Sequence, residues 1–279
     1  MDEEKTVAVF GGGVAGLTAA HELVARGYRV SVYEASPMRS LFPGELGYAL
    51  GGKAKSQYWR TEGGAILPGE HGYRFFPAFY ECVPDTMKRI PVDAHAVDPE
   101  HALDADAFEG QSVFHRNLLP AEEMALARWG QRISPIRREL PGLFEILPLV
   151  SAAWDAFSTI PSGDRMLLVS KMLHFLMTGP VERELELDEI SFWDFMEADT
   201  LSEESKLLLD YGPKSLVAMQ ARVGSARTIL NAFILMMVDF QKERPSDLVL
   251  RGPTTATWIL PWHAWLQRLG VRFHVDAPL

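Results

Sequence analysis

The sequence predicts an α/β protein in which a parallel sheet with flanking helices is interrupted by a mainly helical domain. Three observations support this fold class. Residues 7–34 alternate strand, glycine turn, helix and strand, residues 137–240 show helical patterns punctuated by prolines, and residues 253–275 return to a helix followed by a strand. We therefore expect the α/β domain to begin at residues 1–92, a helical domain at 93–245, and a return to the α/β domain at 246–279.

The first segment of the predicted fold begins with an apolar strand, Val7–Phe10. A glycine-rich turn, Gly11–Gly16, follows it, and a helix spans residues 17–26. A second strand covers residues 29–33 and ends at the acidic residue Glu34. Strand, glycine turn, helix, second strand and terminal acid together form the context that a dinucleotide-binding G-x-G-x-x-G motif requires.

The motif glycines have separate predicted roles. Gly11 permits the tight turn out of the strand, Gly13 lets the backbone approach a diphosphate, and Gly16 lets helix and strand pack closely. The helix N-terminus favours negative charge, and Glu34 is placed to accept hydrogen bonds from ribose hydroxyls. An acid there disfavours the 2′-phosphate of NADP, so FAD and NAD remain. The expected cofactor-binding residues of this segment are Gly11, Gly13, Val14, Ala15, Gly16 and Glu34.

Two further glycine-bearing segments follow a loop expected over residues 36–50. Leu50–Ser56 (L-G-G-K-A-K-S) is a second glycine-rich turn with a cation behind it, and residues 57–61 predict a short strand. Residues 68–76 (P-G-E-H-G-Y-R-F-F) form a third glycine block. Residues 83–90 are typical of a helix.

The composition of the chain changes at Asp93. Residues 94–110 are acidic and irregular, and residues 112–119 predict a strand. A Trp-rich helix over 253–269 and a strand over 271–275 follow near the end of the chain. Between these parts, helices are predicted over residues 121–132, 137–157, 163–178, 191–198, 203–211 and 225–240.

Composition limits the classes of protein and partner. The 279 residues suffice for about two domains, and 47% apolar with 23% charged residues is typical of a globular protein. The net charge of −10 disfavours a nucleic-acid partner. Because Cys82 is the single cysteine, an intrachain disulfide and a thiolate metal cluster are excluded, and the scattered histidines predict no metal site.

Neither a secretory signal nor a membrane span is predicted. Residues 1–5 are mostly charged, and the first apolar stretch is the nucleotide-binding strand itself. The longest apolar runs, 166–177 and 228–240, are too short to cross a bilayer. We therefore expect a cytoplasmic protein whose contact with membranes is at most peripheral.

These segments together resemble the FAD-dependent amine oxidase and phytoene desaturase superfamily, above all its bacterial desaturase-like and hydroxysqualene dehydroxylase-like members. The resemblance rests on Gly11–Gly16 with Glu34, on Gly51–Ser56, which is similar to the family's G-G-[RK]-x-x-S turn, and on the block Gly69–Pro77. A weaker match is R-G-P-T-T-A-T-W-I-L-P-W, residues 251–262. The helical middle fits the family's variable substrate domain and carries no motif of its own.

The resemblance implies a Rossmann-like FAD-binding domain of the glutathione-reductase type with an inserted, mainly helical substrate domain. A NAD enzyme has no need of a second glycine turn, whereas in this family that turn crosses near the diphosphate and the flavin. By resemblance, Gly51 and Gly52 allow close backbone approach, and Lys53 supplies positive charge to the diphosphate. The resemblance adds Ser56 and Gly72 to the cofactor-binding residues.

The resemblance also implies removal of a hydride from a C–H or C–N bond of an apolar or amine substrate, with FAD as the acceptor. Glu70, His71 and Arg74 are the polar groups expected near the isoalloxazine and are the candidate catalytic residues. His71 is a candidate acid/base, with a structural role in its loop as the alternative. Glu70 alternatively accepts N–H groups of the loop, and Arg74 either balances the charge of reduced flavin or pairs with Glu70.

The sequence departs from the family pattern in two places. The gap between Glu34 and Gly51 is longer than usual, and its apolar residues indicate a cover over the adenosine half or an interface loop. The family's C-terminal flavin-binding motif is missing, because the sequence stops at Leu279 after a strand that should pair within the sheet. We therefore expect a second polypeptide to supply this part, with a truncated or cleaved chain as the alternative.

Two other functions fit the same pattern. The Rab escort and GDP-dissociation-inhibitor proteins resemble this architecture and perform no redox chemistry, so a non-catalytic binding or escort subunit is the main alternative. A catalytically idle subunit that helps a partner fold is the other. The intact Gly51–Ser56 turn favours a bound cofactor and hence the oxidoreductase.

Overall fold

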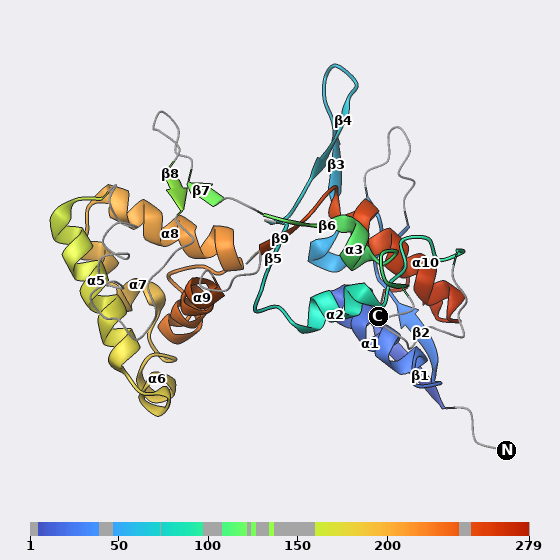
Figure 1. Ribbon diagram of the computed structural model, residues 1–279, viewed down its shortest axis with the longest axis horizontal. Coiled ribbons are helices and arrows are strands. Elements are labelled where there is room, and N and C mark those ends of the chain that lie inside the picture. Colours follow the sequence, from blue (N-terminus) through green and yellow to red (C-terminus); the bar gives the residue numbers. More distant parts are fainter. Residues whose placement is uncertain are drawn as a thin grey trace. The chain divides into compact units, whose positions relative to one another are not determined.

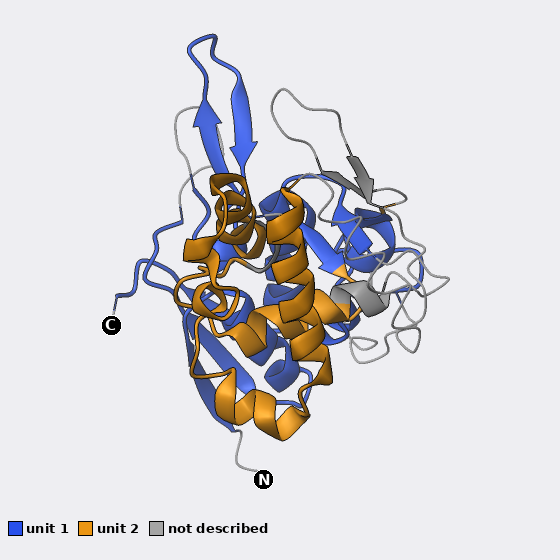
Figure 2. Cartoon of the chain, turned by 90° about the vertical axis from the view of Figure 1, so that its left-hand side faces the viewer, with its two compact units in different colours: residues 1–76, 80–120, 247–279 blue, residues 77–79, 121–246 orange. Residues whose placement is uncertain are grey.

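A computed structural model of the chain divides into two compact units, coloured separately in Figure 2. The first comprises residues 1–76, 80–120 and 247–279, and the second comprises residues 77–79 and 121–246. Almost all of the second unit is therefore one stretch that lies, in sequence, between two parts of the first. The structure describes residues 5–38, 47–72, 74–96, 108–121, 124–126, 134–136, 160–239 and 247–278.

A parallel sheet organises the first unit (Figure 1). Its strands are β1 (Thr6–Phe10), β2 (Arg29–Tyr33) and β10 (Arg272–His274), in the order β1-β2-β10. Both outer strands run parallel to β2, on which Val30 and Val32 are buried. The strands predicted over residues 7–10, 29–33 and 271–275 are confirmed. Among the described strands, β1 forms one edge of this sheet.

Helix α1 (Val14–Val24) connects β1 to β2 and packs against α10 (Leu260–Arg268). Leu17 and Ala20 of α1 are fully buried, as is Trp262 of α10, and all three belong to one hydrophobic core with the valines of β2. Full burial of a side chain such as Leu17 contributes about 2 kcal/mol relative to its exposure. The core of the first unit thus fixes the helix that follows the first glycine turn.

The other strands of the first unit join segments that are far apart in sequence. The strands β5 (Phe75–Pro77), β9 (Asp247–Leu250) and β6 (Leu118–Pro120) form a second sheet in the order β5-β9-β6. The antiparallel hairpin of β3 (Gln57–Arg60) and β4 (Ile66–Gly69) projects from this unit (Figure 1). The strand predicted over residues 57–61 is confirmed.

The strand predicted over residues 112–119 is wrong for most of its length. Residues Val113–Asn117 form helix α3, and the strand begins only at Leu118. The cause is Ser112, whose side chain accepts a hydrogen bond from the backbone N–H of His115. This N-cap satisfies a free N–H group at the start of a helix and so favours a helical turn over an extended chain.

The remaining helices of the first unit agree with the sequence except at one boundary. Helix α2 (Cys82–Lys88) confirms the helix predicted over residues 83–90. The helix predicted over residues 253–269 begins later, at Thr255, with the π-helical segment η5 (Thr255–Ile259) that leads directly into α10. π-helical segments are rare and frequently occur at functional sites.

Residues 93–96 and 108–120 do not belong to the unit in which we expected them. We assigned them to the helical domain, whereas the structure includes them in the first unit. A β-bridge between Pro91 and Ser112 and the pairing of Leu118 with Leu250 tie this segment to the first unit. The return to the first unit falls at Asp247, next to the expected position.

The second unit is mainly helical, and its core contains Phe192, Trp193 and Ile229. The helices predicted over 163–178, 203–211 and 225–240 are confirmed, while the one predicted over 137–157 lies outside the described residues. The helix predicted over 121–132 is wrong at Met124–Leu126, which pairs as an antiparallel strand with Ser134–Ile136. The elements of this unit are β7 (Met124–Leu126), β8 (Ser134–Ile136), α5 (Ser162–Met177), α6 (Pro180–Glu186), α7 (Phe192–Phe195), η4 (Ala198–Thr200), α8 (Glu203–Val217) and α9 (Ala226–Asp239).

None of the helices in the described parts of either unit is long and apolar enough to cross a membrane.

Candidate nucleotide-binding site

The first glycine turn depends on the absence of side chains. Gly11 has a φ of 96°, a left-handed conformation that favours glycine, and its N–H donates to the Tyr33 carbonyl at 2.7 Å. A Cβ on Gly16 would lie 1.9 Å from the Gly11 carbonyl oxygen. The turn and the start of α1 therefore fit together only while residue 16 has no side chain.

The N-terminus of α1 is built without a capping side chain. Gly13 is the N-cap residue and makes no side-chain hydrogen bond, and the first turn of α1 contains no acidic residue. Val14 is half-buried and Ala15 is exposed at this end. The first backbone N–H groups and the positive end of the helix dipole can therefore serve an anion such as a diphosphate.

Glu34 follows β2 and contacts the glycine turn. Its Oε2 accepts the N–H of Gly12 at 2.7 Å, and its Oε1 accepts the N–H of Ser36 at 2.9 Å. Burial by itself would raise the pKa of Glu34, but these hydrogen bonds and the charge of Lys55 outweigh it and hold the pKa below its usual range. An ionised acceptor therefore lies beside the turn.

The structure brings the two glycine turns into direct contact. Gly51 and Gly52 both have a positive φ, 100° and 54° respectively. The N–H of Gly51 donates to the Gly12 carbonyl at 2.7 Å, and a Cβ on Gly52 would lie 3.1 Å from the Cα of Gly13. Both turns therefore lie at the N-terminus of α1.

Gly12 is a site residue that the motif analysis missed. A Cβ on Gly12 would lie 2.4 Å from Leu50 Cδ2 and 3.2 Å from Glu34 Oε2. The motif itself requires glycine at positions 11, 13 and 16, so the additional glycine at position 12 was the available signal. Its partner Leu50 directly precedes the second glycine turn, and the close approach of the two turns therefore depends on Gly12.

Ser56 and Glu70 belong to one hydrogen-bond network with the start of η5. Ser56 is fully buried, and its hydroxyl donates to Glu70 Oε1 at 2.8 Å and accepts the Thr255 N–H at 3.0 Å. The Ser56 N–H donates to Thr255 Oγ1 at 2.7 Å, and Glu70 Oε1 also accepts the Thr254 N–H at 3.1 Å. Both threonines lie in the weaker match over residues 251–262, but sequence reasoning did not place them in the site, because nothing local links them to a glycine turn so distant in sequence.

The other predicted site residues of this region are exposed. Lys53 lies at the surface in the short helical turn η1 (Gly52–Ala54). His71 and Gly72 are exposed after β4, and a Cβ on Gly72 would meet open space. In the described parts of the chain, no group of three or more His, Cys, Asp or Glu side chains is arranged to hold a metal ion.

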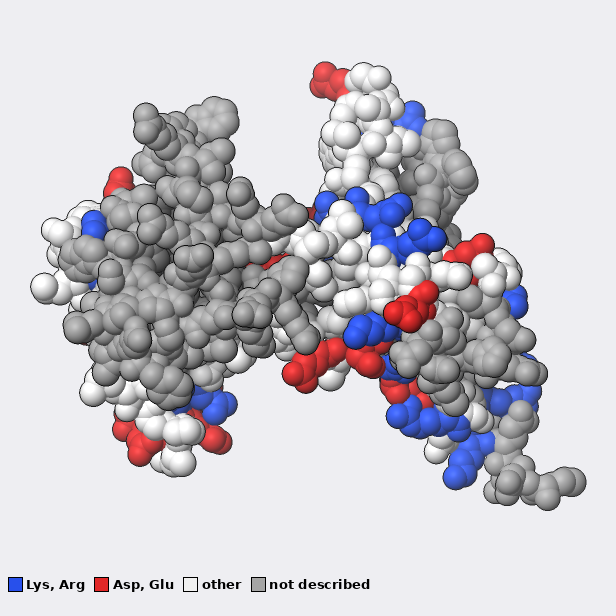
Figure 3. Space-filling model, in the orientation of Figure 1, with Lys and Arg blue, Asp and Glu red and all other residues white. Residues whose placement is uncertain are grey.

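Arginine side chains gather at one end of the second sheet. Arg74 precedes β5, and its guanidinium donates to the Gly252 carbonyl. Arg251 follows β9 and donates to the Arg116 carbonyl at 3.0 Å. Figure 3 shows Lys and Arg side chains near α3 and β6 on the visible face of this unit, with Asp and Glu elsewhere on the same face. Arg74 thus fastens β5 to the segment that leads into η5.

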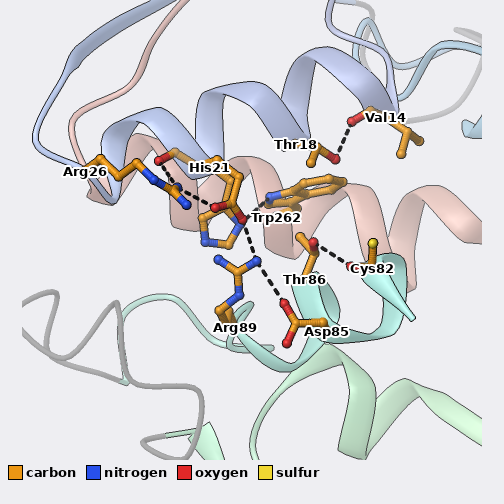
Figure 4. Close-up of polar contacts among 10 residues, drawn as sticks. Val14, Thr18, His21, Arg26, Cys82, Asp85, Thr86, Arg89 and Trp262 are labelled. Atoms are coloured by element: carbon orange, nitrogen blue, oxygen red, sulfur yellow. Dashed lines mark hydrogen bonds and ion pairs between the residues drawn. The ribbon is translucent and has the colours of Figure 1, made fainter. Parts of the chain in front are cut away.

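A buried histidine connects α1 to α10 (Figure 4). His21 is fully buried, and its Nδ1 accepts the indole N–H of Trp262 at 3.2 Å. Arg89 contacts Glu22 at 2.5 Å and Asp85 at 3.1 Å. Burial, assisted by the positive charge of Arg89, lowers the pKa of His21 to about 4, and the imidazole is neutral at physiological pH.

A second aromatic pair, the buried Tyr48 and the half-buried His263, joins the segment before the second glycine turn to α10. The hydroxyl of Tyr48 lies 2.5 Å from Nδ1 of His263, and the His263 ring packs edge-on against Phe273 of β10. Burial raises the pKa of Tyr48 and lowers that of His263 to about 4. Tyr48 belongs to the loop predicted over residues 36–50, of which residues 39–46 lie outside the described residues.

Residues 9–38, which contain the first glycine turn and Glu34, match the family described as NAD(P)-binding Rossmann-like domain. Residues 9–38 therefore carry the sequence of a Rossmann-like NAD(P)-binding domain. The matched segment ends after β2 and does not include the second glycine turn. No curated protein sequence matches the chain.

The solved structures to which the chain is similar include the following three. An oxidoreductase from Methanosarcina mazei has a TM-score of 0.48 at 14% identity, over 98% of this chain and 51% of that chain. A protein from Pyrococcus furiosus has a TM-score of 0.48 at 13% identity, over 97% and 51%. A Rab GDI from Plasmodium falciparum has a TM-score of 0.41 at 9% identity, over 98% and 58%. The chain spans about half the length of the first two of these structures.

Proposed function

We propose that this chain is the nucleotide-binding part of an FAD-dependent oxidoreductase of the amine oxidase and phytoene desaturase type. The observation that carries the proposal is the contact between the two glycine turns. The Gly51 N–H donates to the Gly12 carbonyl, and Gly52 lies against Gly13 at the N-terminus of α1. A NAD site on a Rossmann unit needs only the first of these turns.

The residues present fit the diphosphate and ribose of FAD. The N-terminus of α1 has neither a capping side chain nor a first-turn acid, so its N–H groups suit a diphosphate. Glu34, with its lowered pKa, is an ionised acceptor that suits ribose hydroxyls. Lys53 is exposed beside Gly52 and supplies a positive charge for the diphosphate.

In the proposed reaction, bound FAD supplies the hydride acceptor for oxidation of a C–H or C–N bond in an apolar or amine substrate. The residues of this chain bind and orient the cofactor. Of the three candidate catalytic residues, His71 is exposed. Glu70 and Arg74 hold neighbouring parts of the chain through Thr254 and Gly252.

We further propose that a second polypeptide completes the flavin site. Strand β1 is an edge of the parallel sheet among the described strands, and Phe10 at its end is 59% exposed. On the projecting β3–β4 hairpin, Trp59 and Leu67 lie opposite each other and are 71% and 52% exposed. An open sheet edge and exposed apolar side chains favour association with another chain.

The deciding experiment compares cofactor binding by the chain, alone and co-expressed with the neighbouring reading frame. We expect the purified complex to show the absorption bands of oxidised flavin and to bleach when a substrate of the right class is added without oxygen. Titration of the flavin-free protein should give tight binding of FAD and much weaker binding of NAD. The variant Glu34→Ala should weaken FAD binding, with the exposed Glu62→Ala as its matched control.

The result that contradicts the proposal is a colourless complex that binds neither FAD nor NAD. That result would favour the escort or folding-subunit alternative. Tight binding of NAD without FAD would instead leave an oxidoreductase with a different cofactor. The proposal of a second polypeptide fails by itself if the chain alone is soluble, monomeric and holds flavin.

A further inference from the structure

The first N–H groups of the helix that runs through η5 and α10 are met by acceptors from distant parts of the chain. Thr254 N–H donates to Glu70 Oε1, and Thr255 N–H donates to the Ser56 hydroxyl. The Glu70 carboxylate therefore lies at the positive end of the helix dipole, where a negative charge is stabilising. The bond from Thr255 to Ser56 is buried, and the bond from Thr254 to Glu70 is partly buried.

The same helix contacts both ends of the second glycine turn, Gly51–Ser56. At the far end of the turn, Ser56 and Thr255 exchange two hydrogen bonds, from the Ser56 N–H to Thr255 Oγ1 and from the Thr255 N–H to Ser56 Oγ. At the near end, a Cβ on Gly51 would lie 3.1 Å from Cγ1 of the fully buried Ile259. These contacts fix both ends of the turn Gly51–Ser56 to the helix.

We propose that Glu70 is a positioning residue that fixes the start of this helix against Ser56 and thereby holds the second glycine turn against the first. The last link is the Gly51 N–H, which donates to the Gly12 carbonyl at 2.7 Å. The effect on a diphosphate rests on the proposed function, whereas the link itself does not. Glu70 Oε1 already accepts hydrogen bonds from Ser56 and Thr254, so this oxygen acts within the chain.

Residue-resolved amide hydrogen exchange of the protein without cofactor tests the link. Glu70→Ala removes the acceptor, and we expect the Gly51 amide as well as those of Ser56 and Thr254 to exchange about tenfold faster or more. Glu70→Gln keeps an acceptor oxygen and should preserve most of the protection at Gly51. Glu62→Ala, in the turn of the same hairpin, is the matched control and should leave all three amides unchanged. Faster exchange at Thr254 alone would overturn the proposal.

The affinity for FAD separates positioning from acid/base catalysis. We expect Glu70→Ala to raise the Kd for FAD about tenfold, which corresponds to about 1.4 kcal/mol, and Glu70→Gln to restore most of that loss. A group that transfers protons would lose its role in either variant and need not alter FAD binding. Equal FAD affinity in wild type and Glu70→Ala would therefore overturn the positioning role.

A second variant removes a hydrogen bond between the helix and the second glycine turn. Thr255→Val keeps the size of the buried side chain but removes the oxygen that accepts the Ser56 N–H. We expect it to accelerate exchange at Gly51 even if Glu70→Ala does not fold, and no change at Gly51 would overturn the link. If the wild-type protein binds no FAD, the proposed function fails, and the exchange measurement still decides the role of Glu70.

Discussion

At the scale of single residues, Gly16 is constrained by one contact. Because a Cβ there would lie 1.9 Å from the Gly11 carbonyl oxygen, Gly16→Ala must displace backbone. We expect it to lower the free energy of unfolding by about 2 kcal/mol, measured by urea denaturation, and to weaken nucleotide binding. Gly163→Ala is the control, because Gly163 lies in the first turn of α5 and a Cβ there meets open space. It should leave stability unchanged or raise it slightly.

The lowered pKa of His21 leads us to expect a loss of stability in acid. Its pKa is about 4 in the folded chain and 6.5 when unperturbed, so between these values the unfolded chain binds more protons. The free energy of unfolding should therefore fall as the pH is lowered through this window, by about 3 kcal/mol from His21 alone. His21→Asn keeps an acceptor for the Trp262 N–H without titrating, and should reduce the loss in urea denaturation. An unchanged pH dependence would contradict the shift.

The residues of the first glycine turn could be predicted because their constraints are local. Gly11 and Gly16 are fixed by a turn and a helix that adjoin them in sequence. Gly12 was not predicted as a site residue, because its partner Leu50 is distant in sequence. Glu70 was predicted as a site residue, but its partner Thr254 was not, for the same reason. A motif indicates which residues bind a ligand, but it does not indicate which of them form contacts or hydrogen bonds with distant residues of the chain.

At the scale of elements, Arg89 joins the end of α2 to α1. Its guanidinium contacts Glu22 and Asp85, and its own side chain is 16% exposed. We expect Arg89→Met to lower the free energy of unfolding by about 1 kcal/mol at neutral pH. The variant also removes a positive charge that lowers the pKa of His21, so its stability should fall less steeply in acid. Urea denaturation across the acid range measures both effects, and parallel pH profiles would contradict the coupling.

The elements that sequence reasoning missed are those decided by short polar contacts or by distant pairing. Periodicity indicated α1, α5 and α9, because each has enough turns to show an apolar face. Helix α3 is too short for that and is begun by the Ser112 N-cap. The sheet β5-β9-β6 could not be foreseen, because it joins Phe75–Pro77 to a strand near the end of the chain.

At the scale of the whole molecule, the two parts of the first unit belong to one structure although the second unit separates them in sequence. Strand β10 completes the sheet beside β2, and the His274 carbonyl accepts the Glu34 N–H at 2.8 Å. Helix α10 supplies Trp262 to the core of α1. The candidate site is therefore assembled only when residues 247–278 have folded onto the N-terminal segment.

The exposed apolar face of the β3–β4 hairpin yields a prediction about assembly. Trp59 and Leu67 form a cross-strand pair in water, and a two-stranded hairpin gains little stability by itself. If the second polypeptide covers this face, Trp59→Arg should abolish co-purification of the two chains while leaving the unfolding free energy of this chain nearly unchanged. Leu207→Arg is the matched control, since Leu207 is 56% exposed on α8 of the other unit. Co-purification should survive it. Retention of the partner by Trp59→Arg would place the interface away from the hairpin. The edge formed by β1 among the described strands would then be the surface to test. A charged substitution in β1 would be the test, because a charged residue at an edge strand opposes pairing with another chain.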